Sequence, residues 1–142
     1  MTIRDAGPAD AAQVAELLAE LGYPVEPAEA RGRLERGTER VLVAADGDRL
    51  LGLAAVAVSA NLTTDRPLAR VTALVVRADT RRTGIGRRLV DEAIVLARAG
   101  GCAGLELTSG LRPEREASHR FYVACGFQRS SYRFWLPLTE PA

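Results

Sequence analysis

The chain has 142 residues, of which 47% are hydrophobic and 26% are charged, and its formal net charge is +1. This length and composition predict a single α/β domain over residues 1–142. The near-neutral charge argues against a protein that binds nucleic acid or a membrane surface through its overall charge. No stretch suits a secretory signal or a membrane span, so we expect a cytoplasmic protein.

The first half of the chain predicts an alternation of strands and helices. In chain order these are a strand at 2–4, helices at 8–21 and 27–36, and strands at 40–45 and 50–59. Pro8 and Pro27 suit the first turn of their helices, and Gly22 suits the end of the first one. Asp46-Gly47-Asp48 joins the two later strands in the manner of a hairpin.

Residues 71–99 predict a strand, a basic turn and a helix. Val71–Val76 is an apolar run rich in β-branched residues, which indicates a buried strand. From Ile85 to Ala97, apolar residues recur at spacings of three and four, which indicates a helix with one buried face. The turn between them reads Arg81-Arg82-Thr83-Gly84-Ile85-Gly86.

This turn predicts a site for a phosphate or pyrophosphate. The first amides of a helix have no intrahelical partner, and glycines let an anion approach them closely. Arg81, Arg82, Arg87 and Arg88 surround the same point with guanidinium groups that suit phosphate oxygens. The arginines have a second interpretation as a solvated face, in which Arg87 pairs with Asp91 four residues away.

Two common phosphate-binding motifs do not fit this turn. A Walker A loop needs a lysine, and the chain has none. A dinucleotide-binding fingerprint fits at Gly84 and Gly86, but Leu89 stands where its third glycine belongs. Seven residues, 77–83, also separate the strand from the first glycine, where that motif has a tight turn.

The C-terminal part predicts three more elements. A strand at 103–108 follows the long helix, and the helical crossover makes it parallel to the strand at 71–76. A helix runs from Glu114 to Gly126, and a closing strand spans 127–138. Glu106 lies in the strand at 103–108 and either lines a cleft as a base or faces water, and we favour water. Cys102 and Cys125 lack metal-site spacing, so we expect no metal.

Two segments resemble the motifs of the GCN5-related N-acetyltransferase (GNAT) family. The turn at 81–86 fits the family pattern Gln/Arg-x-x-Gly-x-Gly/Ala, and Val76 to Arg81 resembles its lead-in with Ala78 in place of proline. Residues 115–127, REASHRFYVACGF, resemble a second family segment, with Tyr122 and Gly126-Phe127 at matching positions. The two motifs and their connections cover about residues 71–138, and the first half fits only in the order of its elements.

The resemblance implies a mixed, mostly antiparallel sheet of six to seven strands, with helices on both faces. The fourth and fifth strands would be parallel and splayed apart. It implies acetyl-CoA as co-substrate, with the main chains of Leu74 and Val76 pairing with the pantetheine arm. The expected cofactor-binding residues of the turn are Arg81, Arg82, Thr83, Gly84, Ile85, Gly86 and Arg87.

The resemblance also implies transfer of the acetyl group to a primary amine of a small molecule or a peptide. Tyr122 is the expected general acid that protonates the departing thiolate, although an aromatic residue packed in the core is the alternative. His119 lies one helical turn earlier and is a candidate base or acceptor contact, or simply a packing residue. The acceptor determinants are expected on loops 21–29, 59–66 and 109–114, and a homodimer is compatible with the sequence.

Two other functions compete with catalysis. A non-catalytic module of the same fold would bind or sense acyl-CoA, and the lack of an obvious general base in the sequence keeps this alternative open. A nucleotide-binding regulatory domain would bind ATP or NAD in place of CoA.

Overall fold

A computed structural model describes residues 1–111 and 113–139. The chain divides into two compact units, Met1–Leu107 and Thr108–Ala142, and each is described by itself. The expectation of a single domain stays a prediction. One residue of the predicted acceptor loop 109–114, residue 112, lies outside the described residues.

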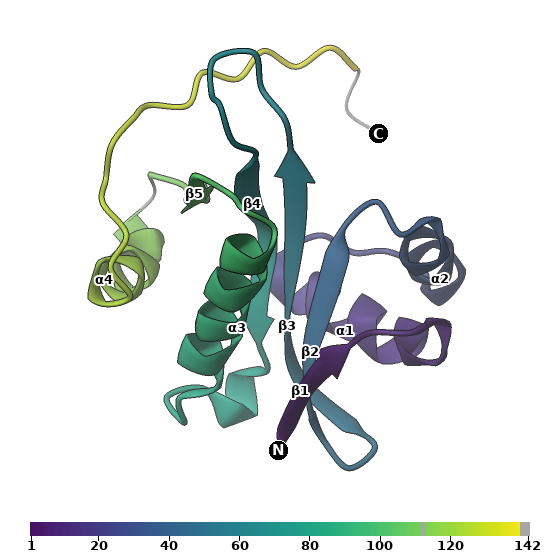
Figure 1. Ribbon diagram of the computed structural model, residues 1–142. Coiled ribbons are helices and arrows are strands. Elements are labelled where there is room, and N and C mark those ends of the chain that lie inside the picture. Colours follow the sequence, from purple (N-terminus) through teal and green to yellow (C-terminus); the bar gives the residue numbers. More distant parts are fainter. Residues whose placement is uncertain (112, 140–142) are drawn as a thin grey trace. The chain divides into compact units, whose positions relative to one another are not determined.

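The first unit is built on a five-stranded mixed sheet with the spatial order β1-β2-β3-β4-β5 (Figure 1). Its strands are β1 (Thr2–Asp5), β2 (Arg40–Asp46), β3 (Arg49–Ser59), β4 (Leu68–Val76) and β5 (Gly104–Glu106). The first four strands pair antiparallel in sequence order, and β5 pairs parallel with β4. The sheet is therefore mostly antiparallel, and the parallel pair that the helical crossover predicts is confirmed.

Helices cover both faces of this sheet (Figure 1). Helices α1 (Ala11–Leu21) and α2 (Pro27–Arg36) lie on one face, and α3 (Ile85–Ala99) lies on the other. Neighbouring strand residues point to opposite faces, so Val43 packs toward α1 while Leu42 packs toward α3. Leu17 of α1 and Leu89 of α3 are fully buried. Burial of each such side chain stabilises the fold by about 1.5–3 kcal/mol.

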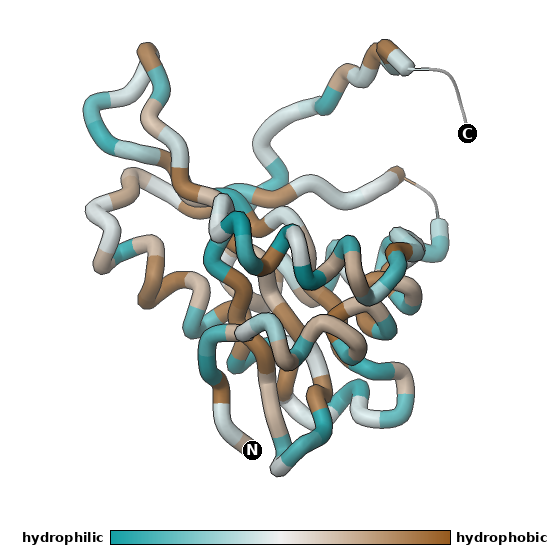
Figure 2. The backbone as a smooth tube through the Cα atoms, turned by 90° about the vertical axis from the view of Figure 1, so that its right-hand side faces the viewer, coloured by the Kyte–Doolittle hydropathy of each residue, from teal (hydrophilic) through white to brown (hydrophobic). Residues whose placement is uncertain are grey.

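The hydropathy of the chain follows this layered packing (Figure 2). The helices alternate between hydrophobic and hydrophilic segments, because each buries only one face against the sheet. The central strand β3 is buried from Leu50 to Val56, as expected for a strand covered on both sides. The residues described include no helix long and apolar enough to cross a membrane.

In the described part of the second unit, the 3-10 turn η3 (Pro113–Arg115) leads into helix α4 (Glu116–Ala124). The chain from 127 to 139 forms no strand. Its large apolar side chains are exposed, namely Tyr132, Phe134, Trp135, Leu136 and Leu138. Along this segment, Figure 2 shows hydrophobic bands separated by more hydrophilic ones.

Several predicted features of the fold need correction. The sheet of the described chain has five strands instead of six to seven, because 127–138 has the alternation of a strand but no paired neighbour for its backbone. The strand expected at 103–108 shortens to Gly104–Glu106. The first helix begins at Ala11, since Pro8–Asp10 forms a separate 3-10 turn.

Candidate active site

The basic turn connects β4 to α3 through an unusual backbone path. A 3-10 turn, η2 (Ala78–Thr80), follows β4, and α3 then begins at Ile85. Gly84 caps α3 in the left-handed conformation, with φ 85°. Arg82 is also left-handed, with φ 65°, and no other non-glycine residue among those described has positive φ. That conformation costs an L-residue about 1–2 kcal/mol, and such strain collects at functional sites.

Hydrogen bonds inside the turn hold this path in place. The amide and hydroxyl of Thr80 both donate to the Arg77 carbonyl, at 3.0 and 3.1 Å. The Thr83 hydroxyl donates to the Thr80 carbonyl. The Arg81 Nε donates to the Val76 carbonyl at 3.2 Å. The predicted site side chains of Arg81 and Thr83 are therefore engaged in shaping the loop itself.

The amide end of α3 opens to solvent at Gly84. The first intrahelical bond runs from the Arg88 amide to the Gly84 carbonyl at 3.1 Å, so the amides of Ile85 and Gly86 precede the helical ladder. Gly84 is exposed, and a Cβ placed on it would meet no heavy atom within 4 Å. Ile85 anchors this end, because its side chain is buried against the sheet. The geometry fits a phosphate group bound by main-chain amides and the helix dipole.

The arginines around this end differ in their contacts. Arg87 Nε lies 3.2 Å from Asp91 Oδ1, the contact that the interpretation of the arginines as a solvated face describes. Arg88 lies with Nη1 3.8 Å from the Met1 sulfur. Arg82 is exposed at the left-handed position of the turn.

The end of β4 that leads into this turn has an open edge. β5 pairs only with Leu68–Arg70, whereas β4 continues to Val76. In the described part of the chain, no strand pairs with residues 71–76 on the β5 side. The parallel strands therefore separate after three residue pairs, which agrees with the splayed pair that the resemblance implies.

The main chains of Leu74 and Val76 point to this open edge. The Arg77 amide donates to the Leu51 carbonyl of β3 at 2.8 Å, so the main-chain polar groups of Arg77 face β3. The Val75 carbonyl also faces β3, where a Cβ on Gly52 would approach it to 2.8 Å. Because main-chain polar groups alternate in direction along a strand, those of Leu74 and Val76 face away from β3.

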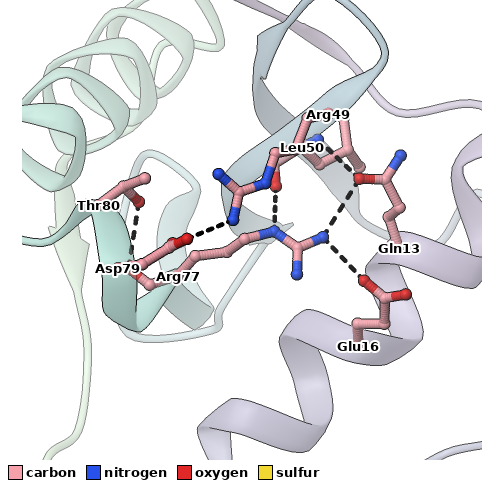
Figure 3. A network of polar contacts seen from close by, with 7 residues as sticks. All are labelled: Gln13, Glu16, Arg49, Leu50, Arg77, Asp79 and Thr80. Carbon is pink, nitrogen blue, oxygen red and sulfur yellow. Dashed lines mark hydrogen bonds and ion pairs between the residues drawn. The ribbon is translucent and has the colours of Figure 1, made fainter.

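Arg77 ties the start of the turn to α1 and to the β2–β3 hairpin (Figure 3). Its Nε donates to the Leu50 carbonyl, and its Nη2 contacts Gln13 Oε1 at 3.2 Å and Glu16 Oε2 at 2.9 Å. The Arg77 side chain is only 13% exposed. Arg49 of β3 adds an exposed ion pair to Asp79 in η2, at 2.6 Å. This network connects α1, the β2–β3 hairpin and the segment that follows β4, where the turn begins.

Sequence reasoning did not identify Arg77 as a structural residue. Side chains alternate between the two faces of a strand, so Arg77 lies on the same face as Val75, two residues earlier. Because Val75 packs toward α1, this alternation could have indicated that Arg77 also faces α1. Glu106, in contrast, behaves as expected for a surface residue, because its carboxylate lies 3.5 Å from Arg70 on the neighbouring strand.

Tyr122 lies in the second unit, at a position that also has a structural role. Gly126 is left-handed, with φ 101°. The Phe127 amide donates to the Tyr122 carbonyl and the Gly126 amide donates to the Val123 carbonyl, both at 3.0 Å. These two bonds form a Schellman motif, which explains why a glycine and a hydrophobic residue follow Tyr122 at this spacing.

Burial affects the Tyr122 phenol. Desolvation raises its pKa above the ordinary tyrosine value, with a smaller opposing effect from Arg115 and a smaller raising effect from Cys125. The phenol therefore stays protonated at neutral pH, which is the form that a general acid requires.

Both ring nitrogens of His119 contact polar groups of the second unit. Nε2 lies 2.8 Å from the Gly110 carbonyl, so this nitrogen donates. Nδ1 lies 3.4 Å from Arg129 Nη2 and accepts from that guanidinium. A proton acceptor needs an available lone pair, and here the lone pair of Nδ1 faces a cation.

The structure brings together the predicted residues of the turn and the two β4 residues that lead into it. Tyr122 and His119 share helix α4 of the second unit. No group of three or more potential metal ligands occurs among the residues described.

The comparisons with known proteins agree with this architecture. The family model "Acetyltransferase (GNAT) family" matches residues 11–127. No curated protein sequence matches the chain.

Solved structures cover nearly the whole chain. A structure from Agrobacterium tumefaciens str. C58 assigned as an acetyltransferase is 27% identical, with a TM-score of 0.85 and coverage of 96% of this chain and 99% of that one. A transcriptional regulator from Bacillus halodurans C-125 is 26% identical, with a TM-score of 0.84 and the same coverage of 96% and 99%. An aminoglycoside acetyltransferase from an uncultured soil metagenomic sample is 21% identical, with a TM-score of 0.78 and coverage of 97% and 98%, a likeness of fold alone.

Proposed function

The chain belongs to the acetyltransferase (GNAT) family, and on that premise we propose that it transfers an acetyl group from acetyl-CoA directly to a primary amine of a small molecule or a peptide. One observation carries the proposal. The open edge of β4 runs directly into a left-handed turn and an exposed helix N-terminus. An extended arm that ends in a pyrophosphate matches this combination of features.

Acetyl-CoA would be held mainly by the main chain. The amides of Gly84, Ile85 and Gly86 would bind the pyrophosphate, with Arg82 and Arg87 adding positive charge. Arg81 and Thr83 would act chiefly by fixing the loop, given their hydrogen bonds to Val76 and Thr80. This division predicts that glycine substitutions harm binding more than single arginine substitutions.

The main-chain groups of Leu74 and Val76 would pair with the pantetheine arm as an added strand would. In the transfer step, the amine nitrogen bonds to the acetyl carbonyl carbon and the carbon–sulfur bond breaks. The Tyr122 phenol would donate its proton to the departing sulfur. Burial raises the pKa of this phenol, so it carries its proton at neutral pH.

A non-catalytic acyl-CoA sensor is the second candidate. It is supported by the contacts of His119, because Nε2 lies 2.8 Å from the Gly110 carbonyl and Nδ1 lies 3.4 Å from Arg129 Nη2. The similarity to a structure described as a transcriptional regulator also favours it. Such a module would bind CoA through the same turn without turnover.

Calorimetric titration of the protein with CoA, ATP and NAD tests the binding site. Thiol release from acetyl-CoA, measured across a panel of primary amines, then tests catalysis. We expect binding of CoA in preference to ATP and NAD, and amine-dependent thiol release. Binding of CoA without thiol release for any amine would favour the sensor, and preference for ATP or NAD would contradict both candidates.

A further inference from the structure

We propose that the Glu39 carboxylate binds the acceptor's ammonium group and accepts its proton beside the thioester. This inference rests on the proposed acetyltransferase function and names a candidate general base in the first unit. Glu39 lies between α2 and β2 in the first unit and is partly buried.

The first argument is a contact that spans the sheet. The Thr72 hydroxyl on β4 donates to Glu39 Oε2 at 2.7 Å, although β3 separates β4 from β2. The same hydroxyl lies 3.4 Å from the Ala55 carbonyl of β3. Glu39 therefore reaches across β3 and is held at β4 by one of its two oxygens, which leaves the other oxygen able to accept from an ammonium group.

The second argument is the position of Thr72 at a break in strand register. Ala55 pairs with Ala73 and Val56 pairs with Val71, so Thr72 has no counterpart on β3. Such bulges redirect a side chain out of its regular alternation and are frequent beside active sites. Here the bulge aims the Thr72 hydroxyl at Glu39.

The third argument is the distance along the open edge of β4. Thr72 lies four positions before Val76, which is next to the turn, and a strand rises about 3.3 Å per residue. An extended arm that starts at the turn and follows Val76 and Leu74 therefore reaches Thr72 after roughly 13 Å. The reactive end of that arm and the Glu39 carboxylate would then meet at the bulge.

The fourth argument is an entry for the acceptor. Glu39 also lines a surface hollow of about 200 Å³ that includes Asp5, Leu34 and Arg40. Arg40 neutralises Asp5 through contacts of 2.9 and 3.1 Å. Glu39 is therefore the acidic residue that connects this hollow to β4.

The proton balance of the step is complete. The ammonium group loses two protons in total. Glu39 accepts the first and passes it to solvent, which frees the nitrogen lone pair to form the carbon–nitrogen bond. The carbon–sulfur bond breaks with its electron pair on sulfur, which takes the proton of the Tyr122 phenol. The second proton of the ammonium group then restores that phenol. The products are the amide, free CoA and one released proton.

Glu39→Gln tests the inference because the amide keeps an oxygen for the Thr72 hydroxyl but cannot accept a proton. With the best amine of the panel, we expect kcat/KM to fall about 10²–10⁴-fold, with the Kd for CoA unchanged. Glu35→Gln is the matched control, since Glu35 is an exposed carboxylate of α2 that pairs with Arg31 at 2.9 Å. It should behave like the wild type.

A second measurement needs binding only. The side-chain carboxylate ¹³C resonance of Glu39, assigned by its loss in Glu39→Gln, should shift on addition of acetyl-CoA, while that of Glu35 should not. Equal activity of Glu39→Gln and wild type would overturn the inference and leave the proposed function standing. If the Glu39 resonance does not shift when acetyl-CoA binds, the inference is overturned even if no amine reacts. Failure of the wild type to bind CoA would remove the proposed function and this inference with it.

Discussion

The ring of Phe127 lies edge-on to the ring of Tyr122, with centroids 6.1 Å apart and planes at 71°. The amide of Phe127 also donates to the Tyr122 carbonyl, so the two residues close the end of α4 together. The aromatic ring of Tyr122 therefore contributes to structure, while its hydroxyl is the part proposed for chemistry. Removing only the oxygen separates the two roles.

Tyr122→Phe should leave folding and CoA affinity nearly intact, because the ring still packs against Phe127. We expect kcat to fall about 10²–10⁴-fold, as for loss of a general acid. The defect should ease as pH rises, since a thiolate needs less help from an acid there. Tyr132→Phe, at an exposed tyrosine of the C-terminal segment, is the control. Unchanged turnover with chemistry rate-limiting would assign Tyr122 a purely structural role.

Gly84→Val should weaken CoA binding at least 10-fold, because a branched side chain would occupy the open space above the first amides of α3. Gly22→Val is a matched control. Gly22 is also left-handed and open, with φ 104°, but it ends α1. Both variants should lose about 1–2 kcal/mol of stability from backbone strain. If calorimetry finds equal CoA affinity in the two variants, the turn does not bind the cofactor.

Arg77→Leu should lower the free energy of unfolding by about 1–3 kcal/mol, because the hydrogen-bonding groups of Gln13 and Leu50 lose a partly buried partner. Arg49→Leu removes an exposed ion pair to Asp79 and should cost about 1 kcal/mol or less. Urea denaturation measures both values. Equal stability losses would mean that the Arg77 network does not hold the turn to α1 and the hairpin.

Asp10→Asn should reveal a pH-dependent contribution to stability. Hydrogen bonds from Arg4, aided by the Gly7 amide, hold the pKa of Asp10 below its ordinary value. The folded state therefore favours the carboxylate, and its contribution is present above the ordinary aspartate pKa of about 4 and is lost as pH falls through the folded pKa. We expect a loss of about 1–2 kcal/mol at pH 7.

This difference between wild type and Asp10→Asn should shrink in acid. Asp65→Asn, in the exposed loop before β4, should show no comparable loss at either pH. A stability gap for Asp10→Asn that stays constant from pH 7 to pH 3 would contradict the role of its charge.

Local patterns predicted most of the first unit. The apolar run at 71–76 and the helical spacing after Ile85 located β4 and α3, and Pro27 marked the start of α2. The positions of these strands and helices depend on residues close together in sequence, namely on their backbone preferences and on the spacing of the apolar residues that become buried. The residues of the turn could be found for the same reason, since helix start, glycines and charge are adjacent in sequence.

Contacts between distant residues could not be found in this way. The alternation at 127–138 fits a strand, but alternation does not identify a pairing partner, and this segment has none in the described structure. Arg77 meets Glu16 across 61 positions, and Glu39 meets Thr72 across 33. The Glu39 contact further depends on a register break in β4, which no local pattern of apolar and polar residues marks.

The most direct test of the account follows the acetyl group itself. The wild-type protein is incubated with acetyl-CoA carrying a ¹³C-labelled acetyl group and with the best amine of the panel, and mass spectrometry and thiol titration are run in parallel. The account predicts one labelled N-acetyl product for each CoA thiol released, with both signals strongly reduced in Gly84→Val at an acetyl-CoA concentration that does not saturate the wild type. CoA binding with no labelled amide from any amine would contradict it.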